Sequence, residues 1–302
     1  MDHTDYAPFL PREFRQPTAE PEHTWWDWAG CRVHVARARR PDAPARVVLL
    51  HGSGGHAGAL WPIASLIAAE TFDLAAPDMP LYGRTVVPDP AGIRYTDWIE
   101  LLCDFVESED DGRPLVLVGA SMGGMLAYEV AARTGRVTHV LATCLLDPSG
   151  REARRAASRF PVLGGPAPRL LGELDRVAGR LRIPIALAVD MQAMSADRAL
   201  ARQCAADPRG GGVRMPVGFL ASYFTFAHTR PERFTQAPVT LVHPAEDTWT
   251  PPRLSAEFLG RIAAETRLVL LENCGHFPIE QPGFGELISV AREVCLAVGK
   301  SA

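Results

Sequence analysis

Five residues in the first half of the chain restrict its fold more than any other feature of the sequence. They read Gly119-Ala120-Ser121-Met122-Gly123, follow an apolar run at Leu115 to Val118 and precede a helical pattern that continues to about Arg133. A strand that turns this sharply into a helix has no room for Cβ atoms two residues before and two residues after its apex, which explains both glycines. Such a turn lifts the Ser121 hydroxyl above the sheet. The alternative interpretation is a packing corner built from small residues.

Short apolar runs on both sides of this turn predict a sheet of mostly parallel strands. Runs rich in valine and leucine that neighbour helical patterns are typical of parallel strands buried on both faces. They lie at Val47 to Leu50, Phe72 to Ala76, Leu115 to Val118, His139 to Leu146, Val239 to Val242 and Arg267 to Leu271. Two earlier segments, His23 to Ala29 and Cys31 to Ala38, flank Gly30 and predict an antiparallel hairpin. We therefore expect an α/β fold with a doubly wound sheet that opens with a hairpin.

The alternation of strand and helix patterns stops near residue 148 and resumes near residue 237. Between these points the periodicity indicates helices only, interrupted by clusters of glycine and proline, which predicts an inserted helical cap at 148–236. The core domain then consists of 23–147 and 237–302 and ends with a helix whose apolar face includes Phe284, Leu287 and Val294. Residues 1–22 carry acidic side chains and four prolines, and predict a polar N-terminal arm that is neither a signal peptide nor a membrane anchor.

Charge and cysteine usage narrow the expected partners and compartment. A formal net charge of -4 provides no overall basic field for a phosphate backbone, so we expect small-molecule rather than nucleic-acid partners. The six cysteines show no metal-ligand spacing, which predicts reduced thiols in a cytoplasmic protein. No apolar run approaches the ~20 residues of a transmembrane helix, so no integral membrane segment is expected. The one lysine, Lys300, excludes lysine Schiff-base chemistry from the core.

A glycine-rich segment at the end of the Val47 to Leu50 run predicts a second part of the site. It reads His51-Gly52-Ser53-Gly54-Gly55. Ligands of open α/β sheets gather at the carboxyl ends of strands, and glycines let the main chain approach a substrate closely. The N–H groups of Ser53 and Met122 are therefore the expected donors to a developing oxyanion.

The same glycines also fit a dinucleotide site. Gly52, Gly54 and Ala57 match G-x-G-x-x-[GA] after a strand, and Asp78 ends the next strand, as a ribose-binding acid would. This interpretation would make the protein an oxidoreductase. A lone glycine pattern is weak, and it explains neither the turn at Ser121 nor a late histidine.

One histidine and one aspartate follow late strands, where they can activate a serine. A serine hydroxyl is a poor nucleophile until a base accepts its proton and a carboxylate orients that base. Of nine histidines, His276 alone is predicted on a loop directly after a late strand, so it is the expected base. The expected carboxylate is Asp247, after the preceding strand. Asp147 is the main alternative, and Glu246 a weaker one, because its longer side chain would displace the imidazole.

With these motifs in order, the chain resembles the α/β-hydrolase superfamily over essentially its whole length beyond the arm. The capped layout, the segment from Ala206-Asp207-Pro208 to Phe219-Leu220, and the segment Pro238 to Pro252 are similar to the monoacylglycerol lipase and serine aminopeptidase-like branch. Two departures weaken any transfer of substrate. Ala120 stands where members often have histidine, and the Asp-x-Pro-Gly-x-Gly loop reads Asp78-Met79-Pro80-Leu81-Tyr82-Gly83.

The resemblance implies acyl transfer to water through an acyl-serine, with neither a metal nor an organic cofactor. Ser121 is then the nucleophile, His276 the base and Asp247 the orienting acid, with the oxyanion held by Ser53 and Met122. A carboxylic ester of a small or lipid-like molecule is the expected substrate. Thioester or carbon–carbon bond hydrolysis by the same residues, and a non-catalytic receptor with this fold, remain alternatives.

The predicted cap is richer in apolar side chains than a short insertion needs for its own core. Some of these side chains are therefore expected to face the site and to bind an apolar acyl group. The candidates include Leu170, Leu181, Leu187, Met194, Phe219, Leu220, Tyr223 and Phe224.

Overall fold

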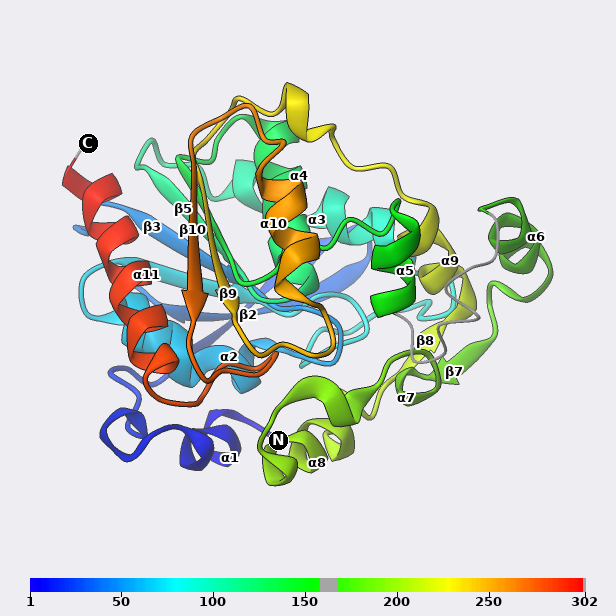
Figure 1. Cartoon of the computed structure of the whole chain (residues 1–302), viewed down its shortest axis with the longest axis horizontal. Coiled ribbons are helices and arrows are strands. Elements are labelled where there is room, and N and C mark those ends of the chain that lie inside the picture. The colour runs from blue at the N-terminus through cyan, green and yellow to red at the C-terminus, as the bar shows by residue number, and fades with distance from the viewer. Residues whose placement is uncertain (158–167, 301–302) are drawn as a thin grey trace.

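The computed structural model describes residues 1–157 and 168–300 and contains one eight-stranded sheet (Figure 1). The strands follow the order β1-β2-β4-β3-β5-β6-β9-β10. Their bounds are β1 Glu22–Trp28, β2 Cys31–Ala38, β3 Arg46–Leu50, β4 Asp73–Pro77, β5 Leu115–Gly119, β6 His139–Ala142, β9 Val239–Pro244 and β10 Thr266–Leu271.

The pairing of the strands matches the sequence pattern. β1 and β2 form an antiparallel hairpin, β2 pairs antiparallel with β4, and all pairs from β4 to β10 are parallel. The continuous apolar runs belong to strands buried on both faces, as in β3 and β5, where every residue is buried. The α/β fold class and the opening hairpin are therefore confirmed. The predicted strand from His139 is shorter than expected, because the chain leaves the sheet after Ala142.

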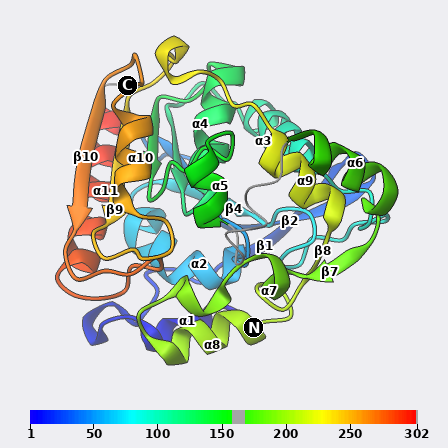
Figure 2. The ribbon, with the colours of Figure 1, turned by 45° about the vertical axis from the view of Figure 1, so that its right-hand side comes forward.

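Helices cover both faces of this sheet (Figures 1 and 2). One group of packed helices comprises α2 Ala57–Ala64, the π-helical turn η3 Ser65–Ala69 and the C-terminal helix α11 Gly283–Lys300. The other group comprises α3 Tyr95–Ser108, α4 Met122–Thr134 and α10 Pro252–Leu259. The apolar side of α3 supplies fully buried side chains at Trp98, Ile99 and Phe105, so its amphipathic pattern explains where it packs.

The segment between β6 and β9 runs beside the carboxyl ends of the strands. Its elements are α5 Arg151–Ala157, α6 Pro168–Ala178, β7 Arg182–Pro184, α7 Ile185–Ala188, η4 Met191–Met194, α8 Arg198–Ala206, β8 Arg214–Pro216, α9 Val217–Thr225 and η5 Pro231–Arg233. Figure 2 shows α6, α7 and α9 on the right of the core and α8 below it, beside α1. Residues 158–167 of the expected cap lie outside the described residues.

The expectation of helices alone in this segment was wrong, because β7 and β8 pair antiparallel. Each strand has three residues and ends at a proline, Pro184 or Pro216. Strands this short show no period of two in a sequence, so the pattern could not predict them.

The first residues of the chain pack more closely than a polar arm would. They form α1 His3–Tyr6, η1 Ala7–Phe9 and η2 Arg12–Phe14, and α1 lies beside α8 in Figure 1. Tyr6 and Leu10 are buried, and the Tyr6 hydroxyl donates to Asp207 at 2.6 Å. His56 Nε2 lies 2.8 Å from the same carboxylate. The N-terminal residues therefore join the core to the segment that contains α8.

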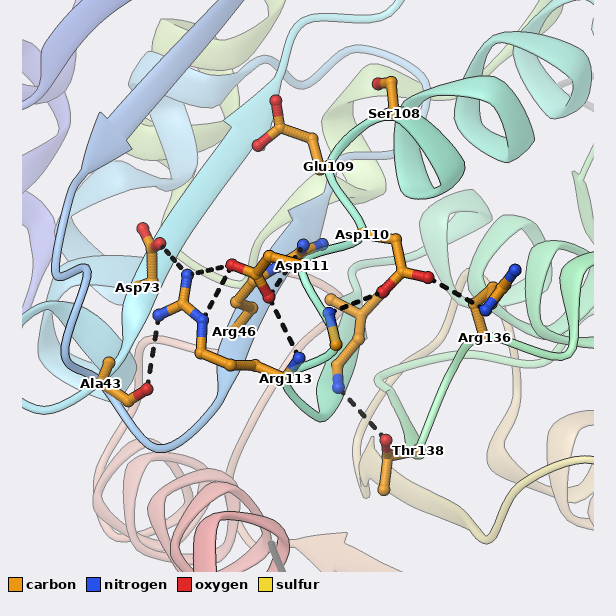
Figure 3. A network of polar contacts seen from close by, with 12 residues as sticks. Ala43, Arg46, Asp73, Ser108, Glu109, Asp110, Asp111, Arg113, Arg136 and Thr138 are labelled. Atoms are coloured by element: carbon orange, nitrogen blue, oxygen red, sulfur yellow. Dashed lines mark hydrogen bonds and ion pairs between the residues drawn. The ribbon is translucent and has the colours of Figure 1, made fainter.

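A polar network holds the amino ends of the strands, at the edge of the sheet opposite the one described below (Figure 3). Arg113 donates to Asp73 and Asp111, and Arg46 lies 3.6 Å from Asp111. The hydrogen bond from Arg113 lowers the pKa of Asp111 to about 2. These contacts fix the starts of β3, β4 and β5 relative to one another.

In the part of the chain that the structure describes, no helix is both long enough and apolar enough to cross a membrane.

Candidate active site

Ser121 lies at the apex of the turn between β5 and α4. Its backbone has φ +54°, a value that an L-residue other than glycine rarely adopts. A Cβ on Gly119 would collide with the Gly123 carbonyl oxygen, and one on Gly123 would collide with the Leu50 carbonyl oxygen. Both glycines are required for the steric reason expected from the sequence. The first turn of α4 begins at Met122, so the positive end of its dipole lies beside the serine.

The structure brings the three residues predicted to act together into one chain of hydrogen bonds. His276, on the loop after β10, has Nε2 2.8 Å from Ser121 Oγ. Its Nδ1 donates to Asp247 Oδ2, on the loop after β9, at 2.7 Å. The side chains of His276 and Asp247 are 4% and 1% exposed, so these contacts are shielded from water. Since Nδ1 carries the proton, Nε2 is free to accept the proton of Ser121.

Four hydrogen bonds hold the Asp247 carboxylate in one orientation. Oδ1 accepts from the Trp249 and Thr250 N–H groups at 2.9 Å, and Oδ2 accepts from Thr250 Oγ1 at 2.6 Å as well as from His276. Burial alone would raise the pKa of Asp247, but the bonds from His276 and Thr250 outweigh it and lower the pKa. Sequence reasoning missed Thr250. A threonine three residues after a loop aspartate is the signal that would have found it.

The two alternative carboxylates lie elsewhere. Asp147 is 3.5 Å from His228 Nδ1 and accepts hydrogen bonds from Ser149, which makes it a turn residue. Glu246 is exposed. Of the three acids considered, Asp247 is the one with a hydrogen bond to His276.

The glycine-rich segment after β3 lies directly against the turn that carries Ser121. A Cβ on Gly52 would stand 2.9 Å from the Ser121 Cβ and 3.0 Å from the Met122 nitrogen. The Ser53 hydroxyl lies 3.0 Å from the Tyr82 hydroxyl, and burial raises the pKa of Tyr82 to about 12. The main chain of this segment therefore lies in contact with the turn that carries Ser121.

The buried His51 side chain fixes the start of this segment. His51 Nδ1 donates to the Gly52 carbonyl at 2.8 Å, and its Nε2 accepts from the Met79 N–H at 2.9 Å. Burial lowers the pKa of His51 to about 4, so the ring is neutral at pH 7. Sequence reasoning assigned no role in the site to His51 or Tyr82, since the His51–Met79 and Ser53–Tyr82 contacts join residues 28 and 29 positions apart.

Asp78 is not placed to bind a ribose. Its side chain is 1% exposed and takes hydrogen bonds from the N–H groups of Ala57 and Arg84. His34 Nδ1 lies 2.7 Å from the same carboxylate. The acid that the dinucleotide interpretation assigns to the ribose is therefore a structural carboxylate.

Among residues 1–157 and 168–300, no group of three or more histidine, cysteine, aspartate or glutamate side chains is arranged to hold a metal ion.

Two pockets meet at Ser121 and Ser53. The α9 pocket, of about 640 Å³, is lined by α9 through Phe219, Leu220, Tyr223 and Phe224 and by core residues that include Met125 and Trp249. The α2 pocket, of about 790 Å³, is lined by α2 and η3 through Ala59, Leu60, Ile63 and Ile67 and by His276 with the two residues after it. Of the apolar residues expected to face the site, those on α9 and Met194 line these pockets, whereas Leu170, Leu181 and Leu187 are exposed.

Comparisons with known proteins agree with this fold. A family model described as "Alpha/beta hydrolase family" matches residues 47–284. A search of curated protein sequences finds no match. Similar solved structures include a soluble variant of monoglyceride lipase from Saccharomyces cerevisiae, with 16% identity, a TM-score of 0.73 and coverage of 94% of this chain and 97% of that chain.

Two further structures show how widely the fold is shared. A monoacylglycerol lipase from Paleococcus ferrophilus has 20% identity and a TM-score of 0.68, covering 89% of this chain and 99% of that chain. An enol-lactonase from Burkholderia xenovorans LB400 has 16% identity and a TM-score of 0.63, covering 91% of this chain and 100% of that chain. At these identities the similarity shows the fold.

Proposed function

The chain belongs to the alpha/beta hydrolase family, and we propose that it hydrolyses a carboxylic ester through an acyl intermediate on Ser121. The observation that carries the proposal is the pair of hydrogen bonds from Ser121 to His276 and from His276 to Asp247, at 2.8 and 2.7 Å. A hydroxyl, a neutral imidazole with a free Nε2 and a buried carboxylate in this order can generate a nucleophile at neutral pH.

In the first half of the reaction, His276 Nε2 accepts the Ser121 proton as Oγ attacks the substrate carbonyl. The N–H groups of Met122 and Ser53 donate to the oxyanion that forms, and the dipole of α4 stabilises its charge. The intermediate then collapses, the bond to the leaving oxygen breaks, and His276 returns the proton to that oxygen. The products at this stage are an alcohol and an acyl-serine.

In the second half, water replaces the alcohol beside His276. The imidazole accepts a proton from this water, the resulting hydroxide equivalent attacks the acyl carbon, and the same donors hold the second oxyanion. Collapse of this intermediate returns the proton to Ser121 and releases the carboxylic acid. Asp247 stays ionised throughout and stabilises the imidazolium.

We place the acyl group in the α9 pocket, whose lining is mostly aromatic and aliphatic. Four of its lining residues come from α9, within the segment 148–236 that we propose acts as a cap. Two oxyanion donors, Met122 and Ser53, line this pocket as well. We also propose a cytoplasmic setting, supported by six cysteines that are all free thiols.

Kinetics of single and double variants test this proposal. Ser121→Ala and His276→Ala should each lower kcat on p-nitrophenyl butanoate by roughly 10⁴ to 10⁶, with the double variant little worse, because the residues act as one unit. Ser149→Ala, which alters an exposed serine, is the matched control. Additive losses, or a Ser121→Ala protein with more than about a hundredth of the activity, would contradict the assignment. Thioesters and carbon–carbon bond substrates assayed alongside the esters identify the bond that is cleaved.

A further inference from the structure

The α2 pocket is larger than the α9 pocket, and an acyl group bound under α9 leaves it empty. It begins at Ser121 and Ser53 and extends toward Ile67 on the π-helical turn η3 and Leu287 on α11. Most of its walls therefore come from the core of the fold, and Met194 and Cys204 are contributed by the segment 148–236. A π-helical turn such as η3 is a distortion that is frequent at functional sites.

The position of His276 shows which part of a substrate this pocket can receive. His276 lines the α2 pocket, together with Phe277 and Pro278, and is not among the lining residues of the α9 pocket. In the proposed reaction, Nε2 must lie within hydrogen-bond distance of the leaving oxygen when the bond to the acyl carbon breaks. The group attached to that oxygen therefore extends into the space that His276 borders.

The polar groups in the lining of the α2 pocket are already engaged with the protein. Thr143 Oγ1 accepts from the Ser121 N–H at 3.0 Å, and Ser53 Oγ lies 3.0 Å from the Tyr82 hydroxyl. Burial raises the pKa of Cys204 to about 12, so its thiol stays neutral. No aspartate, glutamate, lysine or arginine lines the pocket in the described part of the chain.

We propose that the substrates are esters whose leaving alcohol is apolar as well as the acyl group, and that the α2 pocket binds this alcohol. The proposal rests on ester hydrolysis at Ser121. When the bond between the acyl carbon and the ester oxygen breaks, the oxygen takes the electron pair and the proton that His276 received from Ser121. A free aliphatic alcohol results, still seated among Leu60, Ile63 and Ile67. A glycerol leaving group would instead bury hydroxyls that find no partner.

A matched pair of esters tests the polarity of the pocket in the unmodified protein. Propyl butanoate and 2,3-dihydroxypropyl butanoate differ only by two hydroxyls on the alcohol, and acid release measures hydrolysis of both. We expect kcat/KM to be at least about 10-fold higher for the propyl ester. Along methyl, ethyl, propyl and butyl butanoates, kcat/KM should rise about fourfold for each methylene. An equal or faster rate with the dihydroxypropyl ester would overturn the proposal.

Two variants test which pocket holds the alcohol. Ile67→Trp fills the α2 pocket, and Leu220→Trp is its counterpart in the α9 pocket. Ile67→Trp should flatten the alcohol series beyond ethyl and leave the dependence of kcat/KM on acyl length unchanged, measured along methyl esters from acetate to octanoate, whose alcohol is too small to reach the substituted position. Leu220→Trp should do the reverse. If Ile67→Trp shortened the acyl preference instead, the assignment would be wrong. Leu60→Trp serves the same purpose if Ile67→Trp does not fold.

A fluorophosphonate separates failure of this inference from failure of the proposed function. If the reagent labels Ser121 and p-nitrophenyl esters are hydrolysed, but alcohol length has no effect, the alcohol pocket alone is refuted. If Ser121 is not labelled and no ester is cleaved, the proposed function falls and the inference falls with it.

Discussion

Asp247→Asn changes one atom and should remove nearly all activity. Asp247 Oδ1 accepts from two backbone N–H groups, those of Trp249 and Thr250. An asparagine at this position keeps both bonds only if its carbonyl oxygen takes the place of Oδ1. Its NH₂ group then takes the place of Oδ2 and points at His276 Nδ1, where a carboxylate oxygen accepted a proton at 2.7 Å.

Two donors cannot face each other, so the imidazole must change its tautomer. Nδ1 then accepts from the amide, and the ring proton moves to Nε2, which faces Ser121 Oγ at 2.8 Å. In this tautomer Nε2 cannot accept the serine proton. The expected loss in kcat is roughly 10³ to 10⁴ with KM nearly unchanged, the scale of this substitution in serine proteases.

The assay is the pH dependence of kcat on p-nitrophenyl butanoate, with circular dichroism to show that the variant is folded. Asp147→Asn is the matched control, since Asp147 contacts His228 and Ser149 rather than His276. We expect it to retain at least about a third of the activity. A loss smaller than tenfold in Asp247→Asn, or an equal loss in Asp147→Asn, would refute the reasoning.

Three further substitutions or conditions test the surroundings of Ser121. Thr250→Val keeps the shape but removes the donor to Asp247 Oδ2 at 2.6 Å, so kcat should fall about tenfold with KM unchanged; an unchanged kcat would mean that Thr250 does not position the carboxylate. Gly123→Ala places a Cβ against the Leu50 carbonyl oxygen and should lower the free energy of unfolding in urea by about 1–3 kcal/mol, whereas Gly172→Ala, with open space around it, should not. His51 has its pKa lowered from 6.5 to about 4 by burial, so its contribution to stability is complete above pH 6.5 and is lost as the pH falls toward 4. His51 should account for about 3 kcal/mol of the drop in the free energy of unfolding over that window, so the drop should be smaller by about that amount in His51→Gln.

The sequence predicted the parts of the molecule that depend on local patterns. The turn at Ser121 combines a strand, two glycines and a helix within a few residues, and each is needed for a local steric reason. The strands of the parallel sheet are continuous apolar runs, so their positions follow from burial on both faces. His276 and Asp247 were predicted from their place after late strands, and the structure joins both to Ser121 in one chain of hydrogen bonds through His276.

What the sequence did not predict depends on contacts between distant residues. Tyr6 meets Asp207, 201 positions away, and Tyr82 meets Ser53 across the end of the sheet. The α2 pocket is formed by residues that range from Leu49 to Leu287. No local pattern marks such a pocket, because it is the space left between helices and strands once their apolar faces have packed. The three-residue strands β7 and β8 were not predicted for a different reason, since they are too short to show a period of two in the sequence.

Covalent labelling of the native protein tests the central claim most directly. A fluorophosphonate incubated with the unmodified chain should add one equivalent of label, because an activated serine attacks phosphorus far faster than an ordinary hydroxyl. Peptide mass spectrometry should locate the label on Ser121, and His276→Ala should slow the reaction by several orders of magnitude. Label on another residue, or labelling that persists in Ser121→Ala, would contradict the account.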